Sequence, residues 1–404
     1  MTEERQAANY GRDPFPGNPV MAAARASYNP QPAYVAEIEK HNLIHNPDGT
    51  VTLLRMADVL KLNRSKATLG NGHHGGGIGA AARRLIPLDL DGAEHLKYRR
   101  IIDPLFTPKA IARWEPMIRE RANELIDTFV ADGEVDVYAK WCELLPSSIF
   151  LQMMGIPLTD LEYFLDFKNK QLHPDPTLPL DEMLAEMTAA ADRCYAYFEK
   201  VIDERTASGD LGDDLIGWCL TAEVDGERLS RNDILDITYL FMIAGLDTVA
   251  ASLANIINHL ATHPDKRKAI LADTSRWPAA IEEIMRFESP VTEGSRKTLE
   301  DIELGGELHK AGTVFHVSWH SSNLDPEVFP DPLKVDFDRT PNPHIVFASG
   351  FHRCLGSHLA RMELRVALDE FHKRIPNYRV AVPEAELVYT GNPRTPVELP
   401  ITWK

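Results

Sequence analysis

The stretch from about 231 to 262 constrains the fold most, because it predicts one long helix that is apolar on nearly all sides. Ser230 and Asp233 resemble a capping box at its start. A helix without a polar face is stable only when other elements surround it. Its longest apolar run, roughly ITYLFMIAGL at 237–246, is too short to span a bilayer, which takes about 20 residues. We therefore expect a long central buried helix in a chain without a membrane anchor.

Helical spacing dominates the region from about 93 to 264, with shorter strand patterns before and after it. A strand pair is predicted around 42–55 with NPDG as its turn, and alternation around a Gly-Gly turn predicts strands within 301–319. Pro-rich chain at 323–346 should be irregular, and a helix over 355–374 should precede C-terminal strands. We expect a mainly α fold with a smaller β part, forming a single domain over 1–404.

The charge and the cysteines exclude several classes of protein. The formal net charge of −17 argues against general nucleic-acid binding, which needs basic surface. The N-terminus lacks the basic and apolar segments of a secretory signal. The four cysteines are scattered, without a CxxC pair. A reducing, cytoplasmic setting fits this pattern, and we expect a monomer.

One cysteine lies in the stretch FASGFHRCLG, residues 347–356. Cys354 directly precedes the predicted helix, where the positive end of the helix dipole stabilises a thiolate. Gly350 and Gly356 would let the backbone pass close to something flat and bulky, and a single thiolate can be the axial ligand of haem iron. A buried, inert cysteine is the alternative. No ligand spacing supports a zinc site, and no partner pattern supports a Cys-His nucleophile.

The segment AGLDT, 244–248, places two polar residues inside the long apolar helix. An acid and a hydroxyl are costly to bury there unless they are paired or useful. Gly245 removes a side chain and should leave room for a small ligand or a water. The alternative is that Thr248 bonds back to the preceding turn while Asp247 forms a salt bridge elsewhere.

Two charged pairs also have helical spacing. Glu283 and Arg286, in EEIMR, can pair on one helix face. His95 and Arg99 lie four residues apart, so they also share one helix face. For each pair the alternative is an ordinary solvated charge on the surface.

These segments resemble those of the cytochrome P450 family, the haem-thiolate monooxygenases. All five positions of the family's haem signature are matched, by Phe347, Gly350, His352, Cys354 and Gly356. H-x-x-x-R, A-G-x-D-T, E-x-x-R and this signature also follow the family's order along the chain. NLDPEVFPDP, 323–332, resembles the family's segment before the cysteine. The resemblance implies a single-domain cytochrome P450 fold.

The resemblance also implies which residues hold the cofactor, haem b (iron protoporphyrin IX). Cys354 is expected to be the proximal iron ligand, Phe347 to pack near the thiolate, and His352 to reach a propionate. Further haem contacts are expected from His95, Arg99, Ala244, Gly245, Arg296 and Gly356.

Two other sets of residues receive roles by the same resemblance. Asp247 and Thr248 would guide protons to bound dioxygen as the catalytic pair. Glu283, Arg286 and Arg339 would brace the core behind the haem as structural residues.

The reaction implied is insertion of one oxygen atom from dioxygen into a hydrophobic small molecule, such as a terpenoid, a fatty acid or a similar lipid. Residues 71–80, 165–185 and 291–294 are expected to cover or line its pocket. The chain is too short to include a reductase, and GGGIGA lacks the lysine and hydroxyl of a P-loop. Electrons should therefore come from a separate protein, and the resemblance implies a ferredoxin, less often a flavodoxin, with its own reductase. Candidate docking residues are Arg100, Lys109, Arg113, Arg353 and Arg361.

Two other functions stay open. One is a different haem-thiolate reaction, such as that of a peroxygenase or isomerase, against which the Asp247–Thr248 pair argues. The other is a haem-thiolate ligand sensor without turnover, for which the sequence shows no DNA-binding or partner-binding module.

Overall fold

The computed structural model describes residue 24 and residues 27–70, 83–175, 177–224 and 226–404. Its contacts divide the chain into two compact units. Unit 1 comprises Met1–Thr68, Glu115–Leu145 and Thr248–Lys404, and unit 2 comprises Leu69–Trp114 and Pro146–Asp247. The glycine-rich stretch 71–80 lies outside the described residues. The single domain over 1–404 stays a prediction.

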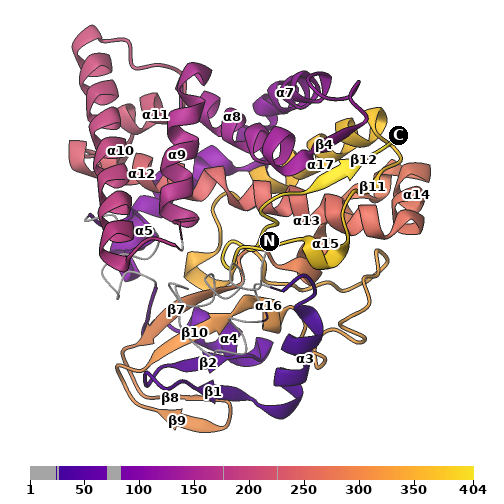
Figure 1. Ribbon diagram of the computed structural model, residues 1–404. Helices are drawn as coiled ribbons and strands as arrows, with labels where there is room; N and C mark the ends of the chain where they lie inside the picture. The colour runs from indigo at the N-terminus through magenta and orange to yellow at the C-terminus, as the bar shows by residue number, and fades with distance from the viewer. Residues whose placement is uncertain (1–23, 25–26, 71–82, 176, 225) are drawn as a thin grey trace. The chain divides into compact units, whose positions relative to one another are not determined.

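The main sheet of unit 1 joins strands that lie far apart in the sequence (Figure 1). β1 (Leu43–His45) and β2 (Val51–Leu53) form the predicted antiparallel pair around NPDG. β2 also pairs in parallel with β10 (Val314–Ser318), and β10 pairs antiparallel with β7 (Glu293–Thr298). The apolar side chains of these strands form one buried cluster with α4 (Met56–Arg64), which includes Val51, Leu53, Met56, Val59, Phe315 and Val317.

Helices and two smaller sheets make up the rest of unit 1. α17 (Ser357–Arg374) packs against α7 (Glu115–Asp127), α13 (Thr248–Thr262) and α15 (Trp277–Glu288). The remaining helices are α3 (Gln31–Lys40), α14 (Pro264–Ala272) and α16 (Trp319–Ser322). β8 (Ile302–Leu304) pairs with β9 (Glu307–His309), and β12 (Pro400–Thr402) pairs with β11 (Arg379–Val380) and β4 (Glu134–Asp136).

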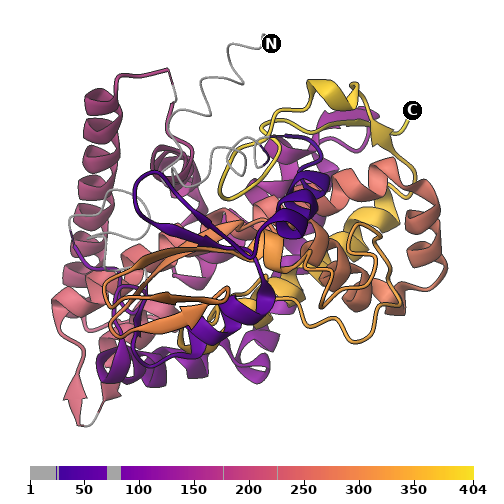
Figure 2. The same ribbon diagram turned by 90° about the horizontal axis from the view of Figure 1, so that it is seen from below.

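Unit 2 is almost wholly helical. α9 (Leu161–Leu172), α10 (Leu180–Ser208) and α12 (Arg231–Leu246) pack together, with Tyr195 of α10 stacked on Tyr239 of α12 at a centroid distance of 4.5 Å. The other helices are α5 (Gly92–Ile102), α6 (Pro108–Ile111), α8 (Leu144–Met153, whose first two residues belong to unit 1) and α11 (Leu215–Thr221). β5 (Glu223–Val224) and β6 (Glu227–Arg228) form a hairpin, seen in Figure 2, and β3 is Thr68–Leu69.

The predicted helix over 231–262 is interrupted. The capping box of Ser230 and Asp233 is confirmed, but α12 ends at Leu246 and α13 begins at Thr248. The Ser147 hydroxyl donates to the Leu246 carbonyl at 3.4 Å, so a side chain enters the helical hydrogen-bond ladder here. α10, with 29 residues, is the longest uninterrupted helix among the described residues, and the expected long buried helical stretch over Arg231–Thr262 is confirmed apart from this one-residue break.

The segment Arg231–Thr262 is, within the described residues, the one segment long and apolar enough to cross a membrane by length and composition. Of its most apolar window, 83% is buried inside the protein, as in the core helix of a globular fold. The mainly α fold with a smaller β part is confirmed, as are the strands within 42–55 and 301–319 and the helix over 355–374.

Candidate active site

Cys354 differs from the other three cysteines in being exposed. Burial raises the pKa of Cys219 to about 12, and it also holds the pKa of Cys142 and Cys194 above the ordinary thiol value, so these three remain thiols. The Cys354 backbone N–H donates to the Phe347 carbonyl at 2.9 Å, which closes the loop of residues 347–356, the cysteine loop. Of the four, Cys354 alone is accessible to ligate a metal.

The two glycines of the cysteine loop lie in different surroundings. Gly350 has a φ of +71°, and a Cβ added to it would lie 2.0 Å from the Asn63 carbonyl oxygen. Gly350 is therefore needed for the packing of the loop on α4, and the expectation that it leaves room for a flat group is wrong. A Cβ added to Gly356 would meet nothing within 4 Å. An exposed cysteine two residues from this open space fits a haem as the bound group.

Asn63 of α4 connects the cysteine loop to Arg296 of β7. The Arg296 side chain donates from Nε to Asn63 Oδ1 at 3.1 Å, and Asn63 Nδ2 donates to Ser349 Oγ at 3.1 Å. Arg296 is only 4% exposed, so its cation is held inside unit 1. The sequence analysis did not identify Asn63, because nothing near residue 63 signals a partner more than 200 positions away. His352 is half-buried, in a short turn at Gly350–His352.

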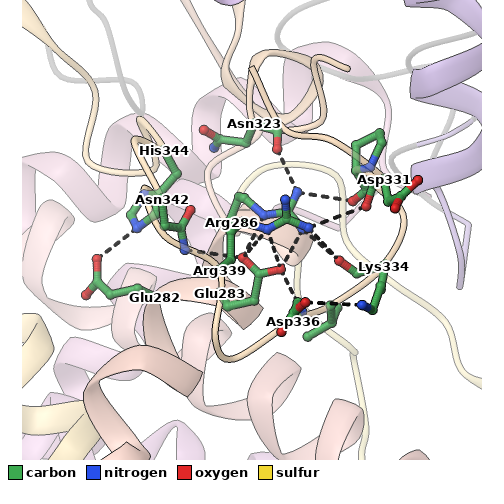
Figure 3. Close-up of polar contacts among 12 residues, drawn as sticks. Glu282, Glu283, Arg286, Asn323, Asp331, Lys334, Asp336, Arg339, Asn342 and His344 are labelled. Carbon is green, nitrogen blue, oxygen red and sulfur yellow. Dashed lines mark hydrogen bonds and ion pairs between the residues drawn. The ribbon is translucent and has the colours of Figure 1, made fainter. Parts of the chain in front are cut away.

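Glu283 and Arg286 lie at the centre of a buried network (Figure 3). The Glu283 carboxylate accepts two hydrogen bonds from Arg286, both at 2.9 Å, and Arg339 Nε lies at 3.1 and 3.2 Å from its two oxygens. The Asn342 amide and the Asp336 backbone N–H also donate to it. Burial would raise the pKa of Glu283, but the hydrogen bonds and charges of its partners lower it overall. The surface-pair alternative is therefore wrong, and Arg339 is the expected third member.

Arg361 is engaged within unit 1, and its expected part in docking stays a prediction. Its Nε and Nη2 donate to the Glu282 carboxylate at 2.6 and 2.8 Å, and the guanidinium lies 4.3 Å from the centre of the Phe347 ring. His344 Nε2 also bonds Glu282, at 2.8 Å. Burial would raise the pKa of Glu282, but His344 and Arg361 lower it to about 2. This ion pair supports Phe347, and with it the cysteine loop. Glu282, missed in the sequence, is adjacent to the recognised motif.

In unit 2, Asp247 is fully buried and forms ion pairs through both carboxylate oxygens. Lys168 Nζ lies 3.2 Å from Oδ1, and His173 Nε2 lies 2.9 Å from Oδ2. Burial alone would raise the pKa of Asp247, but His173 and Lys168 hold it well below its usual range. The salt-bridge alternative for Asp247 is confirmed. A lysine and a histidine in FKNKQLH were the available signal, but the sequence does not show which acid they meet.

The end of α12 carries the other two residues expected there. Ala244 is exposed although the helix around it is buried, so the helix surface is open at this point. A Cβ added to Gly245 would lie 2.7 Å from the Phe150 ring, which occupies the space expected for a ligand or a water. Gly245 therefore allows α8 and α12 to approach closely. Thr248 begins α13, and its carbonyl accepts a bond from Ser252 Oγ at 2.8 Å.

His95 and Arg99 both lie on α5, as the spacing predicts. His95 is buried, at 2% exposure, and Arg99 Nε donates to Asp103 at 2.6 Å. Their contacts with a propionate stay predictions. The remaining docking candidates, Arg100, Lys109, Arg113 and Arg353, are all exposed.

Comparison with known proteins identifies related sequences over most of the chain. The cytochrome P450 family model matches residues 81–276 and 277–388. The mycinamicin IV hydroxylase/epoxidase of Micromonospora griseorubida is 33% identical over 322 residues, 78% of this chain and 79% of that protein. The vitamin D(3) 25-hydroxylase of Pseudonocardia autotrophica is 30% identical over 376 residues, 89% of this chain and 90% of that protein.

A solved structure shows the same fold. The crystal structure of CYP109E1 from Bacillus megaterium in complex with testosterone matches with a TM-score of 0.85 and 27% sequence identity, covering 93% of this chain and 98% of that chain.

Proposed function

This chain belongs to the cytochrome P450 family and is a monooxygenase, and on this premise we propose that it oxidises a hydrophobic small molecule at a haem b ligated by Cys354. The observation that carries the proposal is the cysteine loop. Its cysteine is the exposed one of four, its backbone is closed by the Phe347 carbonyl, and open space adjoins Gly356.

Around a haem bound there, the chain offers an ordered set of contacts. Cys354 would supply the thiolate, and Arg296, His95, Arg99 and His352 would supply donors to the propionates. A thiolate-ligated haem supplies an electron-rich iron that favours cleavage of the O–O bond of dioxygen. Phe347, supported by Arg361, keeps the cysteine side of the site apolar. Ala244 is exposed and has no side chain beyond Cβ, and we propose that it contacts the haem.

Asp247 and Thr248 supply proton transfer in this proposal. Asp247 is held as a carboxylate, so it can accept a proton from a donor and pass it on. Thr248 follows directly and offers a hydroxyl that can both donate and accept. A carboxylate kept away from bulk water limits proton transfer to this one route.

A hydrophobic substrate is favoured by the relatives. They include a methyl-branched lipid omega-hydroxylase of Mycobacterium tuberculosis, 35% identical over 78% of this chain and 74% of that protein. Together with the vitamin D(3) hydroxylase, this supports a terpenoid, a fatty acid or a similar lipid. Residues 165–185 and 291–294 are proposed to line the pocket for it.

Electrons are proposed to come from a ferredoxin, or a flavodoxin, with its reductase. Arg100 and Arg113 are exposed cations of unit 2, and we propose that they contact the acidic electron-transfer partner. We propose a cytoplasmic monomer, which the four free cysteines support. Arg100→Glu with Arg113→Glu should slow reduction by a ferredoxin and weaken its salt dependence, whereas Lys200→Glu, elsewhere on unit 2, should not. Equal reduction rates in the wild type, the double variant and Lys200→Glu would refute this docking surface.

The experiment that tests the function is the spectrum of the reduced protein under carbon monoxide. A strongly red-shifted Soret band in the wild type, lost in Cys354→Ser and kept in the control Cys194→Ala, is expected. Failure to form this band in protein expressed with ample haem would overturn the proposal.

A further inference from the structure

A charged pair, Arg361 with Glu282, lies against the cysteine loop. Arg361 of α17 donates from Nε and Nη2 to the Glu282 carboxylate of α15 at 2.6 and 2.8 Å. Its guanidinium carbon lies 4.3 Å from the centre of the Phe347 ring. The Phe347 carbonyl in turn accepts the Cys354 backbone N–H at 2.9 Å. The cation is therefore two contacts away from the cysteine, through the ring and the backbone of Phe347.

The anion of this pair is fixed in its charge and its position. His344 Nε2 also bonds the Glu282 carboxylate, at 2.8 Å (Figure 3). Burial would raise the pKa of Glu282, but His344 and Arg361 lower it to about 2, so it is a carboxylate at neutral pH. The Arg361 and Glu282 side chains are 31% and 26% exposed, so solvent screens their charges only in part. Two opposite, partly shielded charges thus lie side by side next to the loop.

We propose that the Glu282–Arg361 pair sets the reduction potential of the haem ligated by Cys354, an inference that rests on the proposed function. Neither side chain is assigned a contact with the cofactor or the substrate, and both act through their charge. Arg361 brings a positive charge to the Phe347 ring, and Glu282 balances it. All of these residues belong to unit 1, so the arrangement is complete within one compact unit.

The physical reason is that reduction changes the charge of the site. One electron, supplied by the ferredoxin in the proposed function and by dithionite in the assay, adds one negative charge. A neighbouring cation favours this change and a neighbouring anion opposes it. In the wild type the two charges largely cancel. Loss of the cation leaves the Glu282 carboxylate uncompensated and should lower the potential, whereas loss of the anion leaves Arg361 uncompensated and should raise it.

The reduction potentials of four holoproteins separate this charge effect from structural support. They are the wild type, Arg361→Gln, Glu282→Gln and the variant with both substitutions. Each is titrated with dithionite and redox dyes at pH 7 and low salt, without a ferredoxin, so that a role of Arg361 in docking does not affect the result. The matched controls are Arg84→Gln and Glu94→Gln, each made singly, because these residues form a 3.0 Å ion pair on unit 2 whose side chains are both more than half exposed.

The two single variants should shift in opposite directions. At a fixed applied potential, the ratio of reduced to oxidised protein should fall at least about threefold in Arg361→Gln and rise at least about threefold in Glu282→Gln. Threefold corresponds to ~28 mV, at 59 mV per tenfold change for one electron. The variant with both substitutions and the two controls should differ from the wild type by less than this. Unchanged potentials in both single variants, or shifts of the same sign, would overturn the proposal, because a loosened loop does not produce shifts of opposite sign.

A second readout and a conservative variant cover the case in which Arg361→Gln does not fold. The infrared C–O stretching frequency of the reduced protein under carbon monoxide falls as the thiolate donates more electron density to the iron. It should rise in Glu282→Gln and stay at the wild-type value in Arg361→Lys, which keeps the cation. A wild-type frequency and potential in Glu282→Gln would overturn the proposal. If the wild type lacked the red-shifted Soret band, the proposed function itself would fail instead.

Discussion

Replacing Glu283 with alanine should cost several kcal/mol of stability, because it leaves two buried cations without a counter-charge. Arg286 is fully buried and the Arg339 side chain is 10% exposed, and both place guanidinium nitrogens within 3.2 Å of the Glu283 carboxylate. The substitution also removes the acceptor of the Asn342 amide and the Asp336 backbone N–H. Removing one partner of a buried ion pair costs about 3–5 kcal/mol. We expect a loss in that range.

Urea unfolding of the holoprotein at pH 7, followed by far-UV circular dichroism, measures this loss. The matched control is Glu94→Ala, because Glu94 and Arg84 form a 3.0 Å pair whose side chains are both more than half exposed. Such a pair contributes about 0.2–1 kcal/mol. Glu283→Gln, which keeps the acceptor oxygen but removes the charge, should lie between the two. A loss in Glu283→Ala no larger than that in Glu94→Ala would refute the argument.

Three other predictions concern the cysteine loop, the half-buried Glu282 and the buried Glu363. Gly350→Ala should lower the melting temperature of the haem-free protein, because its Cβ would meet the Asn63 carbonyl oxygen at 2.0 Å, whereas Gly356→Ala should leave that temperature unchanged and reduce the haem content. The folded pKa of Glu282 is about 2, below the 4.5 of an unperturbed glutamate, so its stabilising effect is present above pH 4.5 and lost toward pH 2. Glu282→Gln should therefore lose less stability than the wild type as the pH falls through this range, as measured by urea unfolding. Glu363 is buried, and burial raises its pKa to about 8, so the wild type loses stability as the pH rises from 4.5 to 8. At pH 7 this loss amounts to about 3 kcal/mol, from 2.5 pH units at ~1.36 kcal/mol each, so Glu363→Gln should be more stable than the wild type by that amount. At pH 4 the variant should be no more stable than the wild type.

Each of these has an outcome that contradicts it. Equal melting temperatures for Gly350→Ala and Gly356→Ala without haem would show that the Asn63 contact does not constrain the loop. If Glu282→Gln lost as much stability as the wild type between pH 4.5 and pH 2, the Glu282 carboxylate would not be stabilised by its partners. A Glu363→Gln protein less stable than the wild type at pH 7 would mean that the acid has a partner in the folded protein.

Local features of the fold were predictable because they depend on residues that are close in the sequence. The apolar spacing predicted α17, the NPDG turn predicted the β1–β2 pair, and the two hydrogen bonds of the capping box at Ser230 and Asp233 involve residues three apart. Each of these was confirmed. The cysteine signature is local in the same sense, so the family could be recognised from its motifs and was confirmed by the comparisons.

Pairing between distant segments was not predictable in this way. The parallel pairing of β2 with β10 places Val51 opposite Phe315, and the sequence of neither strand indicates which strand it pairs with. The helix expected over 231–262 is broken at Asp247, since Ser147 reaches the Leu246 carbonyl from a helix 99 residues earlier. Helical spacing continues through the break, so the pattern gives no sign of it.

The sequence by itself determined which chemical groups the site contains: the thiolate of Cys354, the acid and hydroxyl of Asp247 and Thr248, and the cations of α5. The tertiary structure alone decided which partners bind them. Asp247 is held by Lys168 and His173, and Arg361 is taken up by Glu282 instead of remaining free on the surface. The physical reason is that a residue's chemistry belongs to its own side chain, whereas its charge state and its freedom to move depend on neighbours that only chain packing brings within about 3 Å.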